Sequence, residues 1–193
     1  MQFDATFFVG GLTCLDFCNT YGHLHVPPEK DFFSEYASII QWGQAAGILS
    51  TQDKFPSQID DRLLTRLLDL RALIFRLFLP FARSEAPSAA DLEAFNACLK
   101  DVSDHIEIVQ SGGGYALMCS SDKPLEQIIC AVVRSAADLL LSDRHERINQ
   151  CEECGWLFYD TSRNHRRRWC DMKICGNRAK ARRHYERVKA NRE

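Results

Sequence analysis

The chain has 193 residues and a formal net charge of −2, and 46% of its residues are hydrophobic. This length allows one well-buried core and a small additional module, and the composition excludes a disordered or fibrous protein. The first residues have neither a basic start nor a long apolar run, and charged residues interrupt the most apolar segment, 60–82. We therefore expect no signal peptide, no membrane span and a cytoplasmic location.

In the first half of the chain, hydrophobic periodicity predicts mainly helices. Residues 3–8 are predicted as a short strand that a Gly-Gly pair ends, and residues 12–20 fit a strand or a helix. Residues 32–46 and 60–82 carry apolar side chains at helical spacing. In 60–82 they cover most of the helix circumference, which predicts the central helix of the body.

The second half of the body is predicted as two helices around a β-hairpin. Ser88 is a good N-cap for a helix over 89–100. Residues 105–119 alternate on both sides of three glycines, which indicates a hairpin with a loop longer than the tight two-residue kind. A long apolar helix follows with Pro124 in its first turn. The predicted fold class is α+β, mainly α.

Four of the nine cysteines, Cys151, Cys154, Cys170 and Cys175, form a C-x2-C pair and a C-x4-C pair. Two such pairs are typical of one closed, structural Zn²⁺ site with four thiolate ligands. The alternatives are a redox C-x2-C motif, which lacks a second pair nearby, and an iron–sulfur cluster, whose spacing usually differs. The other five cysteines are dispersed in apolar contexts, which argues against a disulfide framework and for a reducing compartment.

The order of elements around these cysteines predicts a treble-clef-like zinc finger. Residues 156–159 and 166–169 are predicted as the strands of a small hairpin. Cys175 is expected at the start of a basic helix that begins near Asn177. A narrow apolar strip on this helix is predicted to dock on the hairpin; it consists of Ala181, His184 and Val188.

Positive charge is concentrated in this part of the chain. Residues 151–193 hold twelve Lys and Arg against six Asp and Glu, a net charge of +6, whereas residues 1–150 hold twelve against twenty, a net charge of −8. An acidic body with a basic tail indicates that the tail meets a polyanion, although a solvated basic helix is the alternative. The residues predicted to contact nucleic acid are Arg163, Asn164, His165, Arg166, Arg167, Arg168, Asn177, Arg178, Lys180, Arg182 and Arg183.

The segment CEECGWLFYDTSRNHRRRWCDMKICGNRAKARRHYER resembles the CGNR zinc finger, whose signature is spelled by residues 175–178. The segment LDFCNT, residues 15–20, is similar to the start of the ABATE domain that usually precedes this finger. The resemblance implies an ABATE-like body over 1–148 and a CGNR finger over 149–193. It also implies a bacterial, stress-induced transcription regulator whose finger binds DNA and whose body senses a ligand or mediates protein contacts.

Within the body, Asp16, Asn19 and Thr20 are polar residues in an apolar segment. They are candidates for the wall of a small-molecule pocket. The alternative is that Asp16 caps a turn and that Asn19 and Thr20 satisfy backbone groups. No phosphate-binding loop, nucleophile elbow or HExxH motif is present, so we expect no enzyme. Three hypotheses remain: a regulator that binds double-stranded DNA, with an effector or a homodimer contact in the body; an RNA-binding module; and a small-molecule binder in which the finger is only structural.

Overall fold

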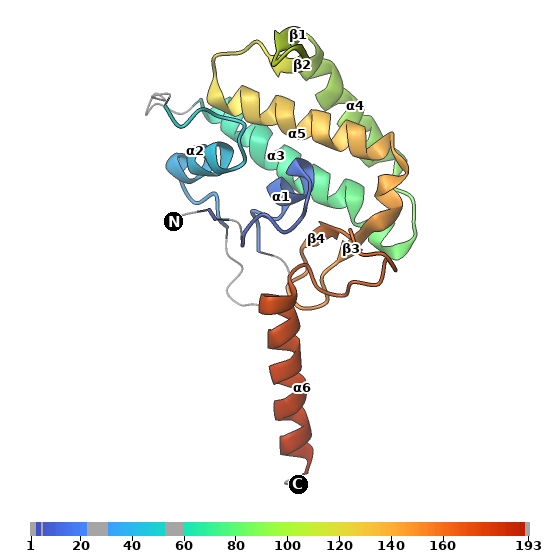
Figure 1. Cartoon of the computed structure of the whole chain (residues 1–193). Coiled ribbons are helices and arrows are strands. Elements are labelled where there is room, and N and C mark those ends of the chain that lie inside the picture. The colour runs from blue at the N-terminus through green and yellow to red at the C-terminus, as the bar shows by residue number, and fades with distance from the viewer. Residues whose placement is uncertain (1–2, 5, 23–30, 53–59, 192–193) are drawn as a thin grey trace.

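The computed structural model describes residues 3–4, 6–22, 31–52 and 60–191. Its body is a set of helices gathered around one short central helix (Figure 1). The helices are α1 (Thr13–Cys18), α2 (Tyr36–Ala45), α3 (Asp61–Phe78), α4 (Ala89–Ser103) and α5 (Pro124–Leu140), with short 3-10 turns η1 (Pro80–Arg83) and η2 (Asp143–Arg147). Among the described residues, no helix is both long and apolar enough to cross a bilayer.

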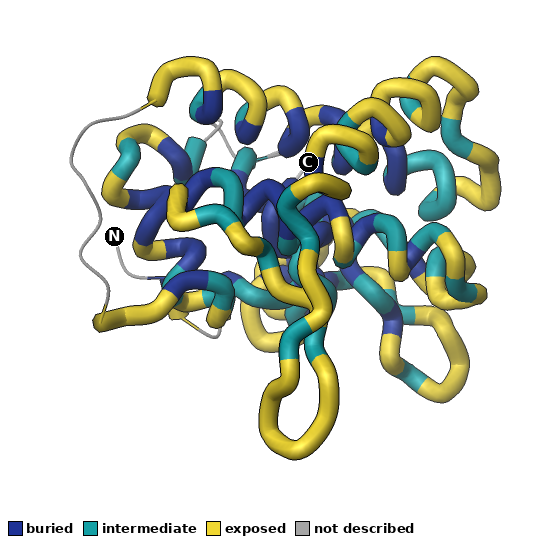
Figure 2. The backbone as a smooth tube through the Cα atoms, turned by 90° about the horizontal axis from the view of Figure 1, so that it is seen from above, coloured by how far each residue is buried: buried dark blue, intermediate teal, exposed yellow. Residues whose placement is uncertain are grey.

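The central element is α1. Every residue from Cys14 to Cys18 is buried, because α1 packs against α3, α5 and a strand of the C-terminal module. A short helix that is buried all round belongs to the interior of the core. The helix predicted over 60–82 is present as α3 followed by η1, but α3 is amphipathic and exposes Arg62 and Arg66, so the central position belongs to α1. Figure 2 shows the buried stretches in the interior of the helical body and the exposed stretches at its periphery.

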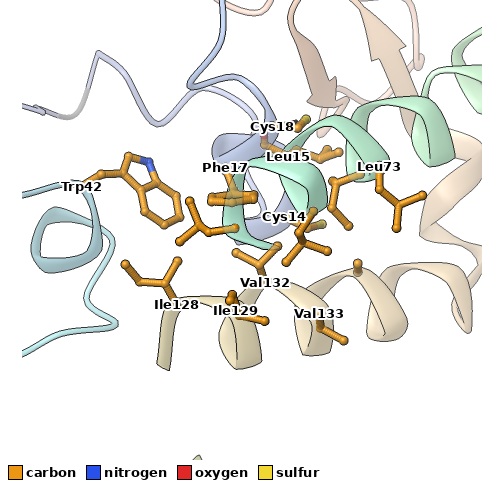
Figure 3. Packing of buried hydrophobic residues seen from close by; sticks show 14 of the residues in the cluster. Cys14, Leu15, Phe17, Cys18, Trp42, Leu73, Ile128, Ile129, Val132 and Val133 are labelled. Carbon is orange, nitrogen blue, oxygen red and sulfur yellow. Dashed lines mark hydrogen bonds between the residues drawn. The ribbon is translucent and has the colours of Figure 1, made fainter. Parts of the chain in front are cut away.

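The core is built where α1, α3 and α5 meet. Figure 3 shows side chains of α5, including Ile128 and Val132, facing Cys14 and Phe17 of α1. The Phe17 ring also lies 5.4 Å from the Trp42 ring of α2. Each fully buried side chain of this size contributes about 1.5–3 kcal/mol to folding. The core thus holds α1 in place against its neighbours, which include α3 and α5.

The predicted first strand is absent from the described residues of 3–8. The Phe7 N–H donates to the Asp4 carbonyl (2.9 Å), which closes a turn. The turn lets Phe3 and Phe7 pack edge to face, with ring centroids 4.8 Å apart. The aromatic residues that suggested a strand are therefore buried from a turn instead.

The β-hairpin consists of β1 (Ile106–Ser111) and β2 (Gly114–Cys119). Ser111 pairs with Gly114, so the turn contains only Gly112 and Gly113. Their φ angles of +57° and +83° lie in the left-handed region that a two-residue hairpin turn requires and that glycine adopts easily. The loop is therefore shorter than predicted, because the third glycine belongs to the strand.

The C-terminal module contains β3 (Ile148–Gln150), β4 (Leu157–Tyr159), a single π-helical turn η3 (Met172–Gly176) and α6 (Asn177–Ala190). β4 pairs with β3, which precedes the first cysteine pair, and not with 166–169 as predicted. The segment 166–169 is instead tied back by one backbone hydrogen bond, from the Glu152 N–H to the Arg168 carbonyl (3.1 Å).

Helix α6 projects from the module away from the helical body (Figure 1). Of its described side chains only Ala179 is buried, and Val188 is partly buried. The predicted docking of Ala181, His184 and Val188 on the hairpin is thus wrong. The strip is too narrow to outweigh the hydration of the charged residues on both sides of it.

Candidate zinc centre and nucleic-acid interface

The four predicted ligands converge on one point. The sulfur atoms of Cys151, Cys154, Cys170 and Cys175 all lie within 4.8 Å of one another. The Cys154–Cys170 and Cys170–Cys175 sulfur separations are 3.6 and 3.7 Å. A tetrahedral zinc with Zn–S bonds of about 2.3 Å requires sulfur atoms roughly 3.8 Å apart. The donor set therefore fits one structural zinc ion that all four thiolates hold.

Two tight turns bring the ligands together. The Cys151 N–H donates to the Trp156 carbonyl and the Gly155 N–H donates to the Cys151 carbonyl, both at 2.8 Å. Gly155 has a φ of +78°, which favours glycine at that position. At the second pair, the Asp171 side chain accepts the Ile174 N–H (2.7 Å) and starts the π-helical turn that carries Cys175.

The electrostatics of the cluster require a cation. Hydrogen bonds from the neighbouring thiols, first of all that of Cys154, lower the pKa of Cys151. The same crowding, led by Cys151, raises the pKa of Cys170 far above its usual value. Four thiolates at this spacing repel each other, and a bound metal cation would neutralise them.

Arg167 stabilises the loop that precedes the third ligand. Its guanidinium lies 5.1 Å from the centre of the Phe158 ring and donates to the carbonyl of Cys170. Its backbone N–H donates to the carboxylate of Asp160 (2.9 Å), which also accepts the Ser162 N–H (2.8 Å). Burial alone would raise the pKa of Asp160, but these hydrogen bonds outweigh it and lower the pKa. Asp160 is fully buried and was missed by the sequence reading, although a turn of the D-x-S type signals such a cap.

Two other predicted contact residues, Arg182 and Arg183, attach α6 to the rest of the finger, and a third, Arg168, forms an ion pair outside α6. Arg182 forms an ion pair with the buried carboxylate of Glu153 (2.9 Å). The guanidinium of Arg183 lies 5.9 Å from the centre of the Trp169 ring. Arg168 pairs with the exposed carboxylate of Glu152. Glu153 and Trp169 were not singled out from the sequence, because no motif distinguishes a knuckle residue that anchors a helix from an ordinary neighbour of a ligand.

The remaining predicted residues face solvent. Asn177 is exposed, and its side chain donates to the Lys173 carbonyl (2.8 Å) at the start of α6. Six more residues are exposed, and their side chains form no ion pair, hydrogen bond or ring contact with any part of the chain that the structure describes. They are Arg163, Asn164, His165, Arg166, Arg178 and Lys180. His165 has a φ of +48° and lies in the segment 163–166, which we call the basic loop. The structure therefore separates cations that build the finger from cations that are available to a partner.

Two family models match this arrangement. The CGNR zinc finger model matches residues 147–188, which include all four ligands and α6 up to Val188. The ABATE model, described as a putative stress-induced transcription regulator, matches residues 11–143. The chain belongs to the ABATE family. Its C-terminal module is a CGNR zinc finger, and no curated protein matches the chain.

The ABATE helices and the CGNR finger are joined through α1 and β4. The Asn19 side chain hydrogen-bonds to both main-chain polar atoms of Leu157. The Tyr159 N–H donates to the Gly10 carbonyl (2.8 Å). Ile148 and Leu157 of the finger are buried in the same apolar cluster as the body helices. The finger is therefore packed on the ABATE helices through β3 and β4, and it does not hang on a tether.

The three residues predicted to bind a ligand have different positions in the ABATE domain. Asn19 is used by the contact with Leu157. The Thr20 hydroxyl donates to the Phe17 carbonyl (2.7 Å) and accepts from the buried guanidinium of Arg71 (3.5 Å). Only Asp16 lines a cavity. The structure thus gives Asn19 and Thr20 the alternative role, in which they satisfy backbone groups, although the partner of Asn19 is distant in the sequence.

The cavity has a volume of about 800 Å³ and lies between α1, α2, α5 and the β1–β2 hairpin. Its wall includes Leu12, Trp42, Ile48 and Leu117, with Asp16 on the α1 side. Asp16 accepts a hydrogen bond from the Gly10 N–H (2.7 Å). Burial raises the pKa of this carboxyl to about 7. The carbonyl of the same Gly10 accepts the Tyr159 N–H of the finger.

Proposed function

We propose that the chain is a transcription regulator that binds double-stranded DNA through its CGNR finger. The observation that carries this proposal is the projecting helix α6. Between Asn177 and Ala190 it holds six Lys and Arg residues and one Glu, and nearly all of its side chains are exposed. An exposed helix with this excess of positive charge gains little for folding, so a polyanionic partner explains it better than packing does.

The dimensions of α6 suit the major groove. A helix of 14 residues is about 21 Å long and, with side chains, roughly 10–12 Å across. The major groove of B-DNA is about 12 Å wide. The basic loop around Arg163 and Arg166 precedes the zinc ligand Cys170, and α6 follows the ligand Cys175, so the zinc centre joins the two segments. The loop would contact phosphates while α6 lies in the groove.

The body supplies the regulatory half of the proposal. An effector in the cavity would contact Asp16, whose carboxylate holds the Gly10 N–H, while the Gly10 carbonyl holds the Tyr159 N–H of the finger. Only two residues thus separate the cavity from β4. A ligand that moves or neutralises Asp16 would therefore shift the finger relative to the body, which would change its affinity for DNA.

Fluorescence anisotropy with the full-length, zinc-loaded protein and a labelled mixed-sequence duplex tests the DNA proposal. The double variant Arg178→Ala/Lys180→Ala removes two unpaired cations of α6 and should lower duplex affinity about tenfold. The matched control is Arg66→Ala/Arg76→Ala, which removes the same charge from the body and should leave affinity within about twofold. Equal losses in the two variants would overturn the role of α6.

A competition arm separates DNA from RNA. The same charges attract both polymers, but structured A-form RNA has a deep, narrow major groove that a helix does not enter. We expect unlabelled duplex DNA to displace the probe at a lower concentration than a structured RNA of equal length. Preferential displacement by RNA would overturn the assignment to DNA.

A further inference from the structure

Two thiols outside the zinc centre lie next to each other in the wall of the cavity. Cys119 is the last residue of β2, Cys130 lies in α5, and their sulfur atoms are 2.8 Å apart. A disulfide bond is roughly 2.05 Å long, so bond formation requires the two sulfur atoms to approach by less than about 1 Å. The fold has therefore already paired two side chains that lie 11 positions apart in the sequence.

The two sulfur atoms differ in their surroundings. Cys130 is 5% exposed, whereas Cys119 is only partly buried. Burial, together with the neighbouring Cys119, raises the pKa of the Cys130 thiol to about 12. Both residues line the cavity, which opens to solvent, so a small reagent reaches them through it. Cys119 is the sulfur that meets the reagent first, and Cys130 stays protonated beside it.

We propose that Cys119 and Cys130 are a thiol modification site that a peroxide converts to a disulfide. In the first step the Cys119 sulfur loses its proton and attacks one peroxide oxygen, the O–O bond breaks, and the released hydroxide takes up the proton, so that a sulfenic acid and water form. In the second step the Cys130 sulfur loses its proton and attacks the Cys119 sulfur, which releases a second water. Two thiols are oxidised and one hydrogen peroxide is reduced to two waters. A dithiol reductant reverses the reaction.

The disulfide would fix the hairpin to α5. The hairpin is already held there by Arg134 of α5, whose guanidinium donates to the Leu117 carbonyl. Leu117, Met118 and Cys119 of the hairpin and Gln127, Cys130 and Arg134 of α5 all line the cavity, and the hairpin and α5 meet at the two sulfur atoms. A covalent bond there would restrict the movement of the hairpin relative to α5. Oxidation would therefore act on the cavity itself and leave the distant zinc centre unchanged.

Peptide mapping of the full-length, zinc-loaded protein tests this proposal. The protein is titrated with hydrogen peroxide, free thiols are blocked with an alkylating agent, and the product is digested with a protease that cleaves after glutamate. Glu126 lies between the two cysteines, so cleavage there leaves them on separate peptides that only a disulfide joins. We expect this linked pair at a peroxide concentration that still leaves one zinc per chain.

Thermal unfolding of the oxidised and reduced protein, and of two cysteine variants, tests the proposal independently. Oxidation should raise the thermal midpoint by about 5 °C, and reduction should restore it. The rise should be absent in Cys119→Ser and retained in Cys98→Ser, which is the control for a thiol elsewhere in the body. Loss of zinc before the linked peptide appears, or linkage of Cys130 to Cys98, would overturn the assignment.

Discussion

The side chain of Asn19 forms two hydrogen bonds with the main chain of Leu157. Its Nδ2 donates to the Leu157 carbonyl (2.8 Å), and its Oδ1 accepts from the Leu157 N–H (3.0 Å). Asn19 and Leu157 are fully buried and lie 138 residues apart in the sequence. One amide therefore provides the outer edge of β4 with the donor and the acceptor that a further strand would supply. This contact joins the central helix of the ABATE domain to the zinc finger.

Asn19→Ala should destabilise the protein by about 3 kcal/mol. The change leaves a buried N–H and a buried carbonyl of Leu157 without partners, and each such group costs about 1–3 kcal/mol. Urea unfolding of the zinc-loaded protein measures the effect. Asn164→Ala, in the exposed basic loop, is the matched control and should change stability by less than about 0.5 kcal/mol. Equal stability of both variants would show that the joint does not depend on this amide.

Cys170→Ser should abolish stoichiometric zinc binding, because a hydroxyl is a poor fourth ligand for a thiolate site. Elemental analysis should find about one zinc per chain in the wild type and close to none in the variant. Cys98→Ser, which changes a cysteine of α4, should keep its zinc. Retention of full zinc by Cys170→Ser would mean that the metal is held elsewhere.

Substitution of two neighbouring arginines should affect different properties, stability in one case and duplex binding in the other. Arg167→Ala removes a guanidinium that packs on Phe158 and donates to the Cys170 carbonyl, so it should lower the thermal midpoint of the finger by several degrees. Arg166→Ala removes an exposed, unpaired cation and should leave the midpoint unchanged while it weakens duplex binding about threefold. Circular dichroism and anisotropy measure the two effects. A similar midpoint for the two variants would contradict the division of the cations into two groups.

Asp16 should make stability fall as pH rises. Burial raises its pKa to about 7 from the ordinary value of 3.8, so between these values the folded chain binds a proton that the unfolded chain has lost. The contribution of this carboxyl therefore decreases from about pH 4 to pH 7, by up to about 1.4 kcal/mol per pH unit. The Asp16→Asn variant has no carboxyl at this position, so it lacks this contribution to the pH dependence.

Unfolding of the wild type and of Asp16→Asn at pH 5 and pH 7 checks this expectation. The pH dependence of zinc binding is present in both proteins and cancels in their difference. The wild type should lose stability relative to the variant between the two pH values. Parallel behaviour would show that Asp16 keeps an ordinary pKa in the folded chain.

The sequence predicts the zinc centre well because the metal imposes its own spacing. Two cysteine pairs that must reach one ion leave few arrangements, and the four sulfur atoms do converge. The cap of α4 by Ser88 is likewise a local effect, and the Ser88 hydroxyl does accept the Asp91 N–H. Such features depend on neighbours in the chain, so they can be recognised without the fold.

Features that depend on distant partners could not be predicted. The segment around Asn19 fits a strand or a helix by its pattern, and its position at the centre of the core is fixed only by α3, α5 and β4. Besides its pairing with β3, β4 docks Leu157 on Asn19, and no local signal encodes this second contact. The division of the basic residues also depends on acidic partners, such as Glu153, whose burial is a property of the folded finger.

The salt dependence of duplex binding by the full-length, zinc-loaded protein tests the central claim most directly. The exposed cations of the basic loop and α6 that form neither an ion pair nor a ring contact in the described chain are Arg163, Arg166, Arg178, Lys180, Arg187 and Lys189. If these six contact phosphates, the logarithm of the binding constant should fall with the logarithm of salt concentration with a slope of about −5. A slope near zero, or no binding to any duplex at low salt, would contradict the account.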